Sequence, residues 1–434
     1  MNGRREPGGG ASDAVARRLR LWQRQGREVY KRAWALEDHN TRCLYLEDAW
    51  FGILSGLASA FLAVYVLRLG GSNTLVGLLT AVPALITILW LVPAGRVIEG
   101  QPDRLRVIIV TSFLFRLAYF LIALVPLFFS AYRAEAVVAI IVIGTVPTAM
   151  ANVAFSSLFA DLVPVHRRAR VVSVRKFLFS AVTTAAALLG GWFLERVPFP
   201  LNFQVIFALG FIASLVSLYY QAQFRLYDIP AQPVTAARAA SSFGQRVRGY
   251  VAMFRANRAF VRFTLSAFAY HWGLYLTIPL YSIYWVRNLN ASDGWIGAFS
   301  MVGGATTALA YPFWGQAATK YGTRPILLAA ALGGTLYPVL TALSPSVEPI
   351  LFVSLVGGVV GAGFNLGLFN RMLELASDEH RPSFLAAYSA LINVAVFVAP
   401  IIGTSLIDRI GIVSALFLGG ALRLLGFLAM TRNA

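Results

Sequence analysis

The sequence predicts an all-α integral membrane protein with twelve transmembrane helices, arranged as two six-helix halves related by a pseudo-twofold axis. Of the 434 residues, 58% are hydrophobic and 13% are charged, which is more apolar surface than a water-soluble domain of this size can cover. The apolar residues fall into twelve runs of about 20 residues, the length that crosses a bilayer as a helix. The two halves of the sequence also resemble each other, which indicates a duplicated unit.

The repeat is visible in residues that recur at a fixed spacing. Asn152 and Asn365 lie 213 residues apart. The same spacing relates Asp161 to Glu374, Gly190 to Gly403 and Arg196 to Arg409. Nearer the start of each half the spacing is 220, which relates Ser72 to Ser292, Gly95 to Gly315 and Arg104 to Arg324. Two copies of a helical unit that face each other are a common way to build a substrate path through a membrane.

The expected spans follow from the apolar runs. In the first half they lie at about 44–68, 74–96, 107–129, 136–162, 172–195 and 203–222. In the second half they lie at about 261–286, 293–316, 325–344, 349–373, 383–407 and 411–430. In lipid the backbone must form its hydrogen bonds within each segment, so these runs are helices. This divides the chain into a basic tail (1–43), a first half (44–222), a linker with a basic amphipathic helix (223–260) and a second half (261–434).

The basic residues predict the orientation of the bundle. When each Lys and Arg outside the spans is assigned to its nearest loop or terminus, thirty fall on one side, ten of them in the N-terminal tail, and five on the other. The five are Arg68, Arg133, Arg196, Arg287 and Arg409. Positive loops face the cytoplasm, so we expect both termini and the linker inside the cell and the protein in the inner (plasma) membrane. The net charge of +18 then reflects these loops, and we expect no nucleic acid partner.

Two loops at equivalent places carry a similar motif. The loop after the eighth span contains Gly315, Lys320 and Arg324, and the loop after the second span contains Gly95, Glu99 and Arg104. Together with the twelve-helix repeat, this pattern resembles the major facilitator superfamily of secondary transporters, of a bacterial type, over about residues 40–432. The resemblance implies alternating access and a central cavity lined by helices 1, 4, 7 and 10.

We expect these loops to act as a gate latch. A glycine lets two helix ends approach closely, and an arginine can hold a carboxylate in one conformation and release it in another. We pair Arg104 with Asp161 and Arg324 with Glu374, and the resemblance implies that the latch stabilises an outward-open form. The alternative is that all four residues only anchor helix ends at the lipid headgroups.

Two asparagines are the main candidates for substrate binding. Asn152 and Asn365 each precede a latch acid by nine residues, about 13.5 Å along a helix, which places them near the middle of the bilayer. Each amide offers donors and acceptors without a charge. The alternative is that they form hydrogen bonds between helices. Thr148, His271, Trp272 and Tyr275 are expected to complete the site, although aromatic residues often serve in packing.

Three titratable residues are candidates for proton coupling. Glu47 and Asp48 lie in the cytoplasmic third of the first helix, where partial desolvation favours the neutral form of a carboxyl group. The alternative is an ordinary acidic helix start. His271 lies near mid-membrane and either relays protons or bonds to a nearby carbonyl.

Two arginines lie deep inside predicted spans, away from the loops to which the other basic residues are assigned. Arg116 is deep, so we expect it to have a partner such as Asp48. Arg423 lies nearer its helix end and is expected to extend to the headgroups.

The sequence therefore predicts a secondary transporter that moves a small organic solute, with proton-coupled export of an amphipathic compound as the first choice. The alternatives are proton-coupled uptake of a neutral solute such as a sugar, a lipid scramblase or flippase, and a solute sensor that does not transport. We expect a monomer whose partners are its substrate, protons and the bilayer. The sequence carries no phosphate-binding loop, catalytic constellation or metal-ligand cluster, so we expect neither an enzyme nor a cofactor.

Overall fold

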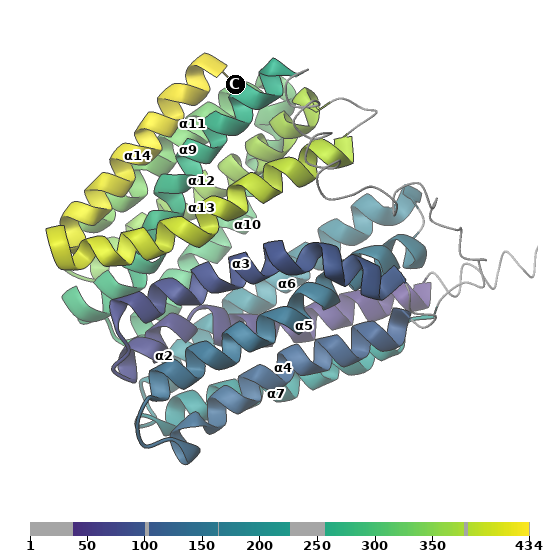
Figure 1. Cartoon of the computed structure of the whole chain (residues 1–434), viewed down its shortest axis with the longest axis vertical. Coiled ribbons are helices and arrows are strands. Elements are labelled where there is room, and N and C mark those ends of the chain that lie inside the picture. The colour runs from purple at the N-terminus through teal and green to yellow at the C-terminus, as the bar shows by residue number, and fades with distance from the viewer. Residues whose placement is uncertain (1–37, 100–103, 164, 226–256, 377–380, 434) are drawn as a thin grey trace, which may run out of the picture.

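The computed structural model describes residues 38–99, 104–163, 165–225, 257–376 and 381–433, and these residues form the predicted bundle of membrane helices (Figure 1). The first helix runs from residue 38 to residue 59 and continues after a turn as α2 (Leu62–Arg68). The first half then contains α3 (Asn73–Glu99), α4 (Arg104–Phe128), α5 (Arg133–Leu162), α6 (Val165–Leu194) and α7 (Leu201–Ala222). The second half contains α9 (Arg258–Ile283), the π-helical turn η2 (Tyr284–Asn288), α10 (Asp293–Tyr321), α11 (Thr323–Leu343), α12 (Glu348–Leu375), α13 (Arg381–Ile410) and α14 (Ile412–Asn433).

Most helix ends lie within a few residues of the prediction, and two helices begin earlier than expected. The first helix is already present at Asp38, and α6 begins at Val165 rather than near residue 172. The added segment of α6 is rich in arginine, which lowers the hydropathy of a segment but favours a helix. The proposed tail helix and most of the linker with its amphipathic helix fall outside the described residues.

Local sequence signals explain several helix ends. Asn257 precedes α9, and its side chain accepts a hydrogen bond from the backbone N–H of Phe260 at 3.0 Å. Gly322 separates α10 from α11 with a φ of +86°, a conformation that residues with a Cβ rarely adopt. Asn257 thus marks the start of α9 after the linker, and Gly322 makes the short connection between α10 and α11.

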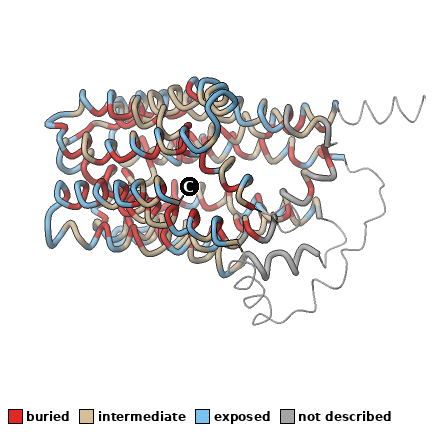
Figure 2. The backbone as a smooth tube through the Cα atoms, turned by 90° about the horizontal axis from the view of Figure 1, so that it is seen from above, coloured by how far each residue is buried: buried red, intermediate tan, exposed pale blue. Residues whose placement is uncertain are grey.

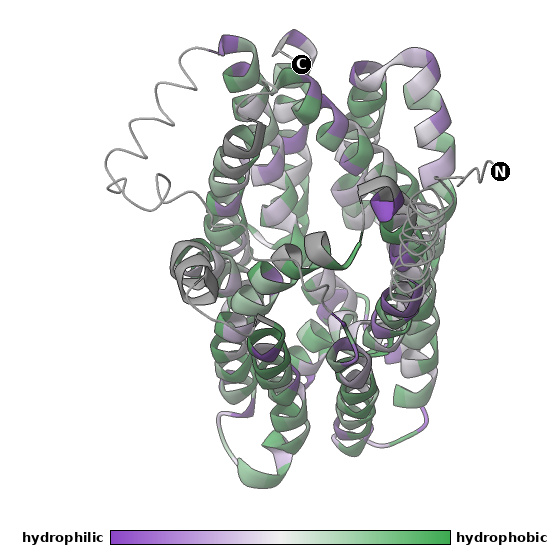
Figure 3. Ribbon diagram, turned by 90° about the vertical axis from the view of Figure 1, so that its right-hand side faces the viewer, coloured by the Kyte–Doolittle hydropathy of each residue, from purple (hydrophilic) through white to green (hydrophobic). Residues whose placement is uncertain are grey.

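The outer surface of the bundle fits a lipid environment. In the part of the chain that the structure describes, ten helices are each long and apolar enough to cross a membrane. Hydrophobic residues cover most of the ribbon (Figure 3). Large apolar side chains are exposed, including Ile143 at 71% and Leu309 at 78%, which water would not favour. Helices α9 and α10 are not among the ten, because they are rich in Tyr, Trp, Gly and Thr, and both line a pocket described below.

The two halves meet at one end of the bundle and diverge toward the other (Figure 1). We call the first the closed end, which carries Arg68 and Asp293, and the second the open end, which carries Asp38 and Gly322. One cluster of buried hydrophobic residues includes Phe61 of the first half and Leu280 of the second, and so joins the halves. Two further clusters lie at the open end, and each belongs to one half. Buried and exposed residues alternate along most helices, so each helix turns one face inward (Figure 2).

Small residues bring the halves together at the closed end. Helix α6 packs against α10, and α3 packs against α13. A Cβ atom added at Gly297 would lie 2.8 Å from the carbonyl oxygen of Ala187, and one added at Gly77 would lie 3.1 Å from that of Pro400. These glycines therefore allow helix backbones to approach closely, as is common inside membranes.

Candidate functional site

The first half contains a pocket of about 480 Å³, which we call the N-half pocket. Five helices of that half contribute to its walls. The lining includes Glu47, Asp48, Ser112, Arg116, Thr148, Asn152, Phe155, Arg175, Lys176 and Gln221. It therefore contains the two predicted proton-coupling carboxyl groups and two of the predicted substrate-binding residues.

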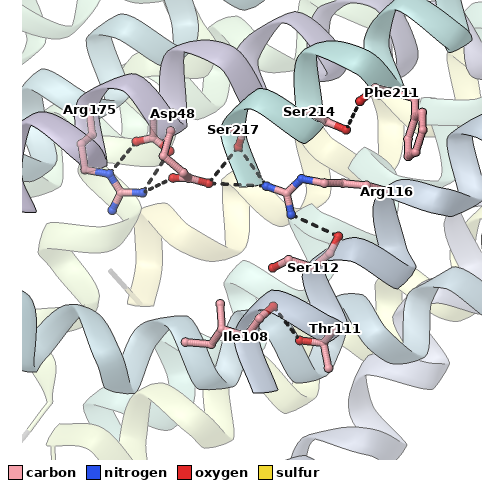
Figure 4. A network of polar contacts seen from close by, with 10 residues as sticks. Asp48, Ile108, Thr111, Ser112, Arg116, Arg175, Phe211, Ser214 and Ser217 are labelled. Carbon is pink, nitrogen blue, oxygen red and sulfur yellow. Dashed lines mark hydrogen bonds and ion pairs between the residues drawn. The ribbon is translucent and has the colours of Figure 1, made fainter. Parts of the chain in front are cut away.

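Two acids and two arginines form a continuous network at this pocket (Figure 4). Glu47 and Asp48 lie on the first helix, Arg116 on α4 and Arg175 on α6. Arg175 Nε lies 2.7 Å from Asp48 Oδ2, and Arg175 Nη2 lies 3.4 Å from Glu47 Oε2. Arg116 Nη2 lies 3.6 Å from the other oxygen of Glu47. The charges therefore alternate along the network and balance one another.

Neutral hydrogen bonds fix the inner end of this network. Arg116 Nη1 donates to the carbonyl oxygen of Ser112 at 3.1 Å, and Nη2 donates to the hydroxyl of Ser217 at 2.9 Å. The side chains of Arg116 and Glu47 are 3% and 7% exposed, and charges this deeply buried need such partners. The prediction that Arg116 has a partner is thus satisfied by Glu47, while Asp48 pairs with Arg175.

Aromatic rings surround the two guanidinium groups. Arg116 lies 5.3 Å from the ring centre of Phe51, and Arg175 lies 4.8 Å from that of Phe155. The Asp48 side chain is 14% exposed, twice the exposure of Glu47. Asp48 is therefore the more accessible of the two acids.

The second half contains a separate pocket of about 400 Å³, which we call the C-half pocket. Six aromatic residues line it: Tyr270, Tyr281, Trp285, Phe299, Tyr337 and Phe364. Small residues such as Gly303, Gly357 and Gly361 provide the space between them. A Cβ atom added at Gly361 would meet nothing within 4 Å.

Arg423 of α14 lines the C-half pocket and is 3% exposed. Its Nη1 donates to the carbonyl oxygen of Gly334 at 2.8 Å. Its Nη2 donates to the hydroxyl oxygens of Thr277 at 2.6 Å and Tyr281 at 2.8 Å. The prediction that Arg423 extends to the headgroups is wrong, because oxygen atoms on two neighbouring helices hold the guanidinium inside the bundle.

The two predicted asparagines occupy different surroundings. Asn152 lines the N-half pocket together with Thr148, whose hydroxyl donates to the carbonyl oxygen of Gly144 at 2.7 Å. Asn365 is exposed on α12 and is not part of the C-half pocket lining, although its neighbour Phe364 is. Asn152 can therefore contact a compound in the N-half pocket, whereas Asn365 does not line the C-half pocket.

His271 is buried on α9 and satisfied by its own helix. Its Nδ1 lies 2.7 Å from the carbonyl oxygen of Ala267, so this nitrogen is the donor. Its ring stacks on Tyr275 at 5.9 Å, and Trp272 packs edge-on against Phe268 at 5.6 Å. His271, Trp272 and Tyr275 are not part of the lining of either described pocket.

The latch residues of the second half do not pair with each other in this conformation. Arg324 donates to the carbonyl oxygen of Thr431 at 2.8 Å. Glu374 accepts hydrogen bonds from Thr323 at 2.7 Å and from Arg371 at 2.9 Å. Gly315 and Lys320 lie near the end of α10. In the first half, Gly95 and Glu99 lie on α3, Arg104 begins α4 and Asp161 is near the end of α5, and their side chains fall outside the described part of the structure.

Arginines also join the two halves at the closed end, which the sequence analysis missed. Arg68 donates to the carbonyl oxygen of Ala291 at 3.0 Å and lies 3.4 Å from Asp293 Oδ1. Arg287 donates to Asn73 Oδ1 at 2.8 Å and to the carbonyl oxygen of Gly71 at 2.7 Å. The sequence did contain a signal for these contacts. Asn73 and Asp293, which bind the two arginines, lie 220 residues apart and so occupy equivalent positions of the internal repeat.

A carboxylate adds a third contact between the halves. Glu195, just after α6, accepts hydrogen bonds from the hydroxyl of Ser292 and from the backbone N–H of Gly294 at 3.2 Å. These donors belong to the first turn of α10, where the helix dipole favours a negative charge. Within the described ranges, no three His, Cys, Asp or Glu side chains gather so as to hold a metal ion.

The family model of the Major Facilitator Superfamily matches residues 50–271 and, a second time, residues 263–432. The chain belongs to this superfamily. It is therefore a member of a family of multi-pass membrane transporters rather than of enzymes. The first match covers the first half and extends into α9, and the second covers the second half.

Three known proteins illustrate the similarity. The multi-drug resistance efflux pump PmrA of Streptococcus pneumoniae is 27% identical over 150 residues, which cover 34% of this chain and 37% of PmrA. Protein ZINC INDUCED FACILITATOR 1 of Arabidopsis thaliana is 28% identical over 125 residues, which cover 27% of this chain and 23% of that protein. The chain thus matches well under two thirds of the length of either relative. A variant of the nucleoside transporter NupG superposes with a TM-score of 0.71 at 13% identity, covering 91% of this chain and 99% of that one, which shows a shared fold.

Proposed function

We propose that this protein couples proton movement to the export of an amphipathic organic compound by alternating access. The N-half pocket is the observation that carries the proposal. It places two adjacent carboxyl groups and two arginines beside the uncharged polar side chains of Thr148 and Asn152. The identity to an efflux pump over 150 residues supports export.

Proton binding at Asp48 is the proposed coupling step. Neutralising Asp48 weakens its pairing with Arg175 and leaves Glu47 as the acid that holds both arginines. Arg175 lies on α6, and the far end of α6 packs against α10 of the other half. A change in the pairing of Arg175 can therefore bias the contact between the halves, as alternating access requires.

We propose, from the positive-inside rule, that the open end faces the cytoplasm with both termini on that side. We propose that the protein works as a monomer in the inner (plasma) membrane. In this orientation the described conformation faces inward, so Asp48 exchanges protons with the cytoplasm. The same conformation admits a compound that is to be exported.

Flux measurements in proteoliposomes test this proposal. The purified full-length chain is reconstituted with a trapped pH indicator, and a panel of anionic, neutral and cationic amphipathic dyes is followed with and without an imposed pH gradient. We expect the gradient to accelerate the flux of at least one dye in the wild-type protein. Asp48→Asn should keep flux down the dye's own gradient but lose the acceleration.

Asp38→Asn is the matched control. Asp38 pairs with Arg167 at the same end of the bundle, but its side chain is 53% exposed and lies away from the pocket, so proton coupling should persist. Wild-type flux that ignores the pH gradient would show that proton coupling is wrong. Acceleration that survives Asp48→Asn would instead remove Asp48 from the coupling step, and transport limited to neutral sugars would favour the uptake alternative.

A further inference from the structure

Each half buries one arginine between its third and sixth spans. In the first half Arg116 of α4 donates to Ser217 of α7, and in the second half Arg423 of α14 donates to Gly334 of α11. The first span of each half completes the site. In the first half it contributes the carboxylate of Glu47, whereas in the second half α9 contributes two hydroxyl groups.

Among the residues that the structure describes, Arg423 therefore has no acidic partner, whereas Arg116 has Glu47. Arg423 lies in the middle of α14, whereas the described acidic residues of the second half lie near helix ends. These are Asp293, Glu348, Glu374 and Asp408. Its described partners are neutral oxygens, and its Nε–H has no partner among the described residues. A buried guanidinium without a counter-charge is costly in a membrane, so an anion would complete this site.

The surroundings of Arg423 define what kind of anion fits. The C-half pocket has a volume of about 400 Å³, within the range of small-molecule sites. Its walls are mostly aromatic rings and glycines, with the hydroxyl groups of Ser300, Thr307 and Ser354 and with Arg423 as the charged side chain of the lining. An aromatic or aliphatic body can fill such a space while one acidic group reaches the guanidinium.

We propose that the C-half pocket binds an amphipathic organic anion, whose acidic group bonds to Arg423 and whose apolar body lies among the aromatic rings. The inference rests on the proposed function, because it names the charge of the compound that is transported. Carboxylates, sulfonates and phosphate esters share the required chemistry, since their oxygens accept hydrogen bonds from the guanidinium. The compound would then supply in the second half the negative charge that Glu47 supplies in the first.

Equilibrium binding tests this inference without any transport. The full-length protein in phosphatidylcholine nanodiscs is titrated by calorimetry with 2-naphthoate and with its uncharged analogue 2-naphthamide, and empty nanodiscs provide the blank. The two probes share the same apolar body and differ in charge. We expect wild-type protein to bind naphthoate about tenfold more tightly than naphthamide, the size of one charge-assisted interaction.

Three variants locate the site. Arg423→Gln should bring the ratio of the two affinities close to one, and Arg423→Lys should retain part of the preference for the anion. Gly361→Leu fills open space in the pocket and should weaken both probes at least about tenfold, because the new side chain occupies the volume that they need. Arg196→Gln removes an exposed arginine at the closed end and should change neither affinity.

Specific outcomes would overturn the inference. It fails if wild-type protein binds both probes equally or binds neither, or if the anion preference survives Arg423→Gln. If Arg423→Gln does not fold, the test depends on Gly361→Leu. Naphthoate binding that is unchanged in Gly361→Leu would show that the anion binds outside the C-half pocket. These results are independent of coupling: an anion site with flux that ignores pH contradicts the proposed function alone, whereas coupled flux without an anion preference contradicts this inference alone.

Discussion

At the residue scale, the buried charges of the first half depend on one another. Arg116 is almost inaccessible to solvent, and Glu47 is the carboxylate that pairs with it. Two serines add hydrogen bonds but no charge. The stability of this region therefore depends on keeping the acid and the arginine together.

Removing Glu47 alone should destabilise the protein strongly. We expect Glu47→Leu to lower the free energy of unfolding by about 3–5 kcal/mol, because it leaves Arg116 buried without its carboxylate. The double variant Glu47→Leu with Arg116→Leu should recover much of this loss. Equilibrium unfolding in mixed micelles compares Glu47→Leu, Arg116→Leu and the double variant with the wild-type protein, which completes a double-mutant cycle.

An exposed acid provides the control for this cycle. Glu135 lies in the first turn of α5, and Glu135→Leu should cost less than about 1 kcal/mol. If the double variant loses as much stability as the two single changes combined, Glu47 and Arg116 act independently and the paired-charge account is wrong.

The sequence identified part of this network. Arg116 was predicted to have a partner because it lies deep within an apolar run, and Glu47 and Asp48 were predicted as functional acids because they lie in the first apolar run. Arg175 was missed because it lies at the very start of the predicted span 172–195, where it was counted with the basic residues of the adjacent cytoplasmic loop. Which acid pairs with which arginine depends on how helices turn toward one another, and spacing within one helix does not contain that information.

At the element scale, the crossing of α6 and α10 determines how closely the halves approach. Gly191 and Gly297 face each other, and a Cβ atom added at Gly297 would lie 3.1 Å from Gly191 Cα and 2.8 Å from the carbonyl oxygen of Ala187. Neither helix can move aside without disturbing the hydrophobic cluster that joins the halves.

A larger residue at this crossing should open the closed end. We expect Gly297→Leu to cost the closed conformation about 1–3 kcal/mol through overpacking. Spin labels at Ala131→Cys and Ser346→Cys, in a Cys43→Ser background, report the separation of the two halves, because both positions are exposed at the closed end. The distance distribution should shift to longer values.

A second glycine of α10 provides the control. A Cβ atom added at Gly303 would lie 3.7 Å from the carbonyl oxygen of Ser354, an ordinary contact, so Gly303→Ala should leave the distance between the labels unchanged. Both changes replace a helical glycine and so share the gain in helix propensity. An unchanged distance in Gly297→Leu would mean that the crossing tolerates a side chain and does not set the approach of the halves.

The helices themselves were predictable because the membrane imposes one length and one polarity on every span. Their packing partners were not, since small residues occur throughout the chain. Gly77 and Gly297 lie 220 residues apart in the repeat, but the contact of Gly297 with α6 depends on the arrangement of the two halves. The start of α6 could not be predicted from hydropathy either, because the helix begins in an arginine-rich segment that precedes the apolar run.

At the scale of the whole molecule, the closed end carries a reciprocal pair of contacts. Arg68 ends α2 and reaches Asp293 at the start of α10, while Arg287 at the end of η2 reaches Asn73 at the start of α3. Asn73 and Asp293 are 220 residues apart, so the internal repeat relates one contact to the other. The twofold symmetry that duplication introduced therefore provides each half with one arginine that binds the other half.

These contacts should favour the closed end without locking it. The Arg68 side chain is 36% exposed, and exposed ion pairs each contribute about 0.2–1 kcal/mol. A transporter needs contacts of this size, because a much stronger pair would hold one conformation throughout the cycle. Removing both arginines should thus change the population of the closed conformation without unfolding the protein.

The double variant Arg68→Gln with Arg287→Gln measures this effect. We expect it to lower the ratio of closed to open conformations about fivefold, equivalent to about 1 kcal/mol, as reported by the label pair on Ala131 and Ser346. Each single variant should produce about half of that free-energy change, because the two contacts are equivalent by symmetry. Arg196→Gln removes a third arginine from the same end that bonds within its own half, so its distance distribution should match that of the unsubstituted labelled protein. If Arg196→Gln produced the same shift as the double variant, the effect would come from net charge at the closed end, and the reciprocal contacts would have no specific role.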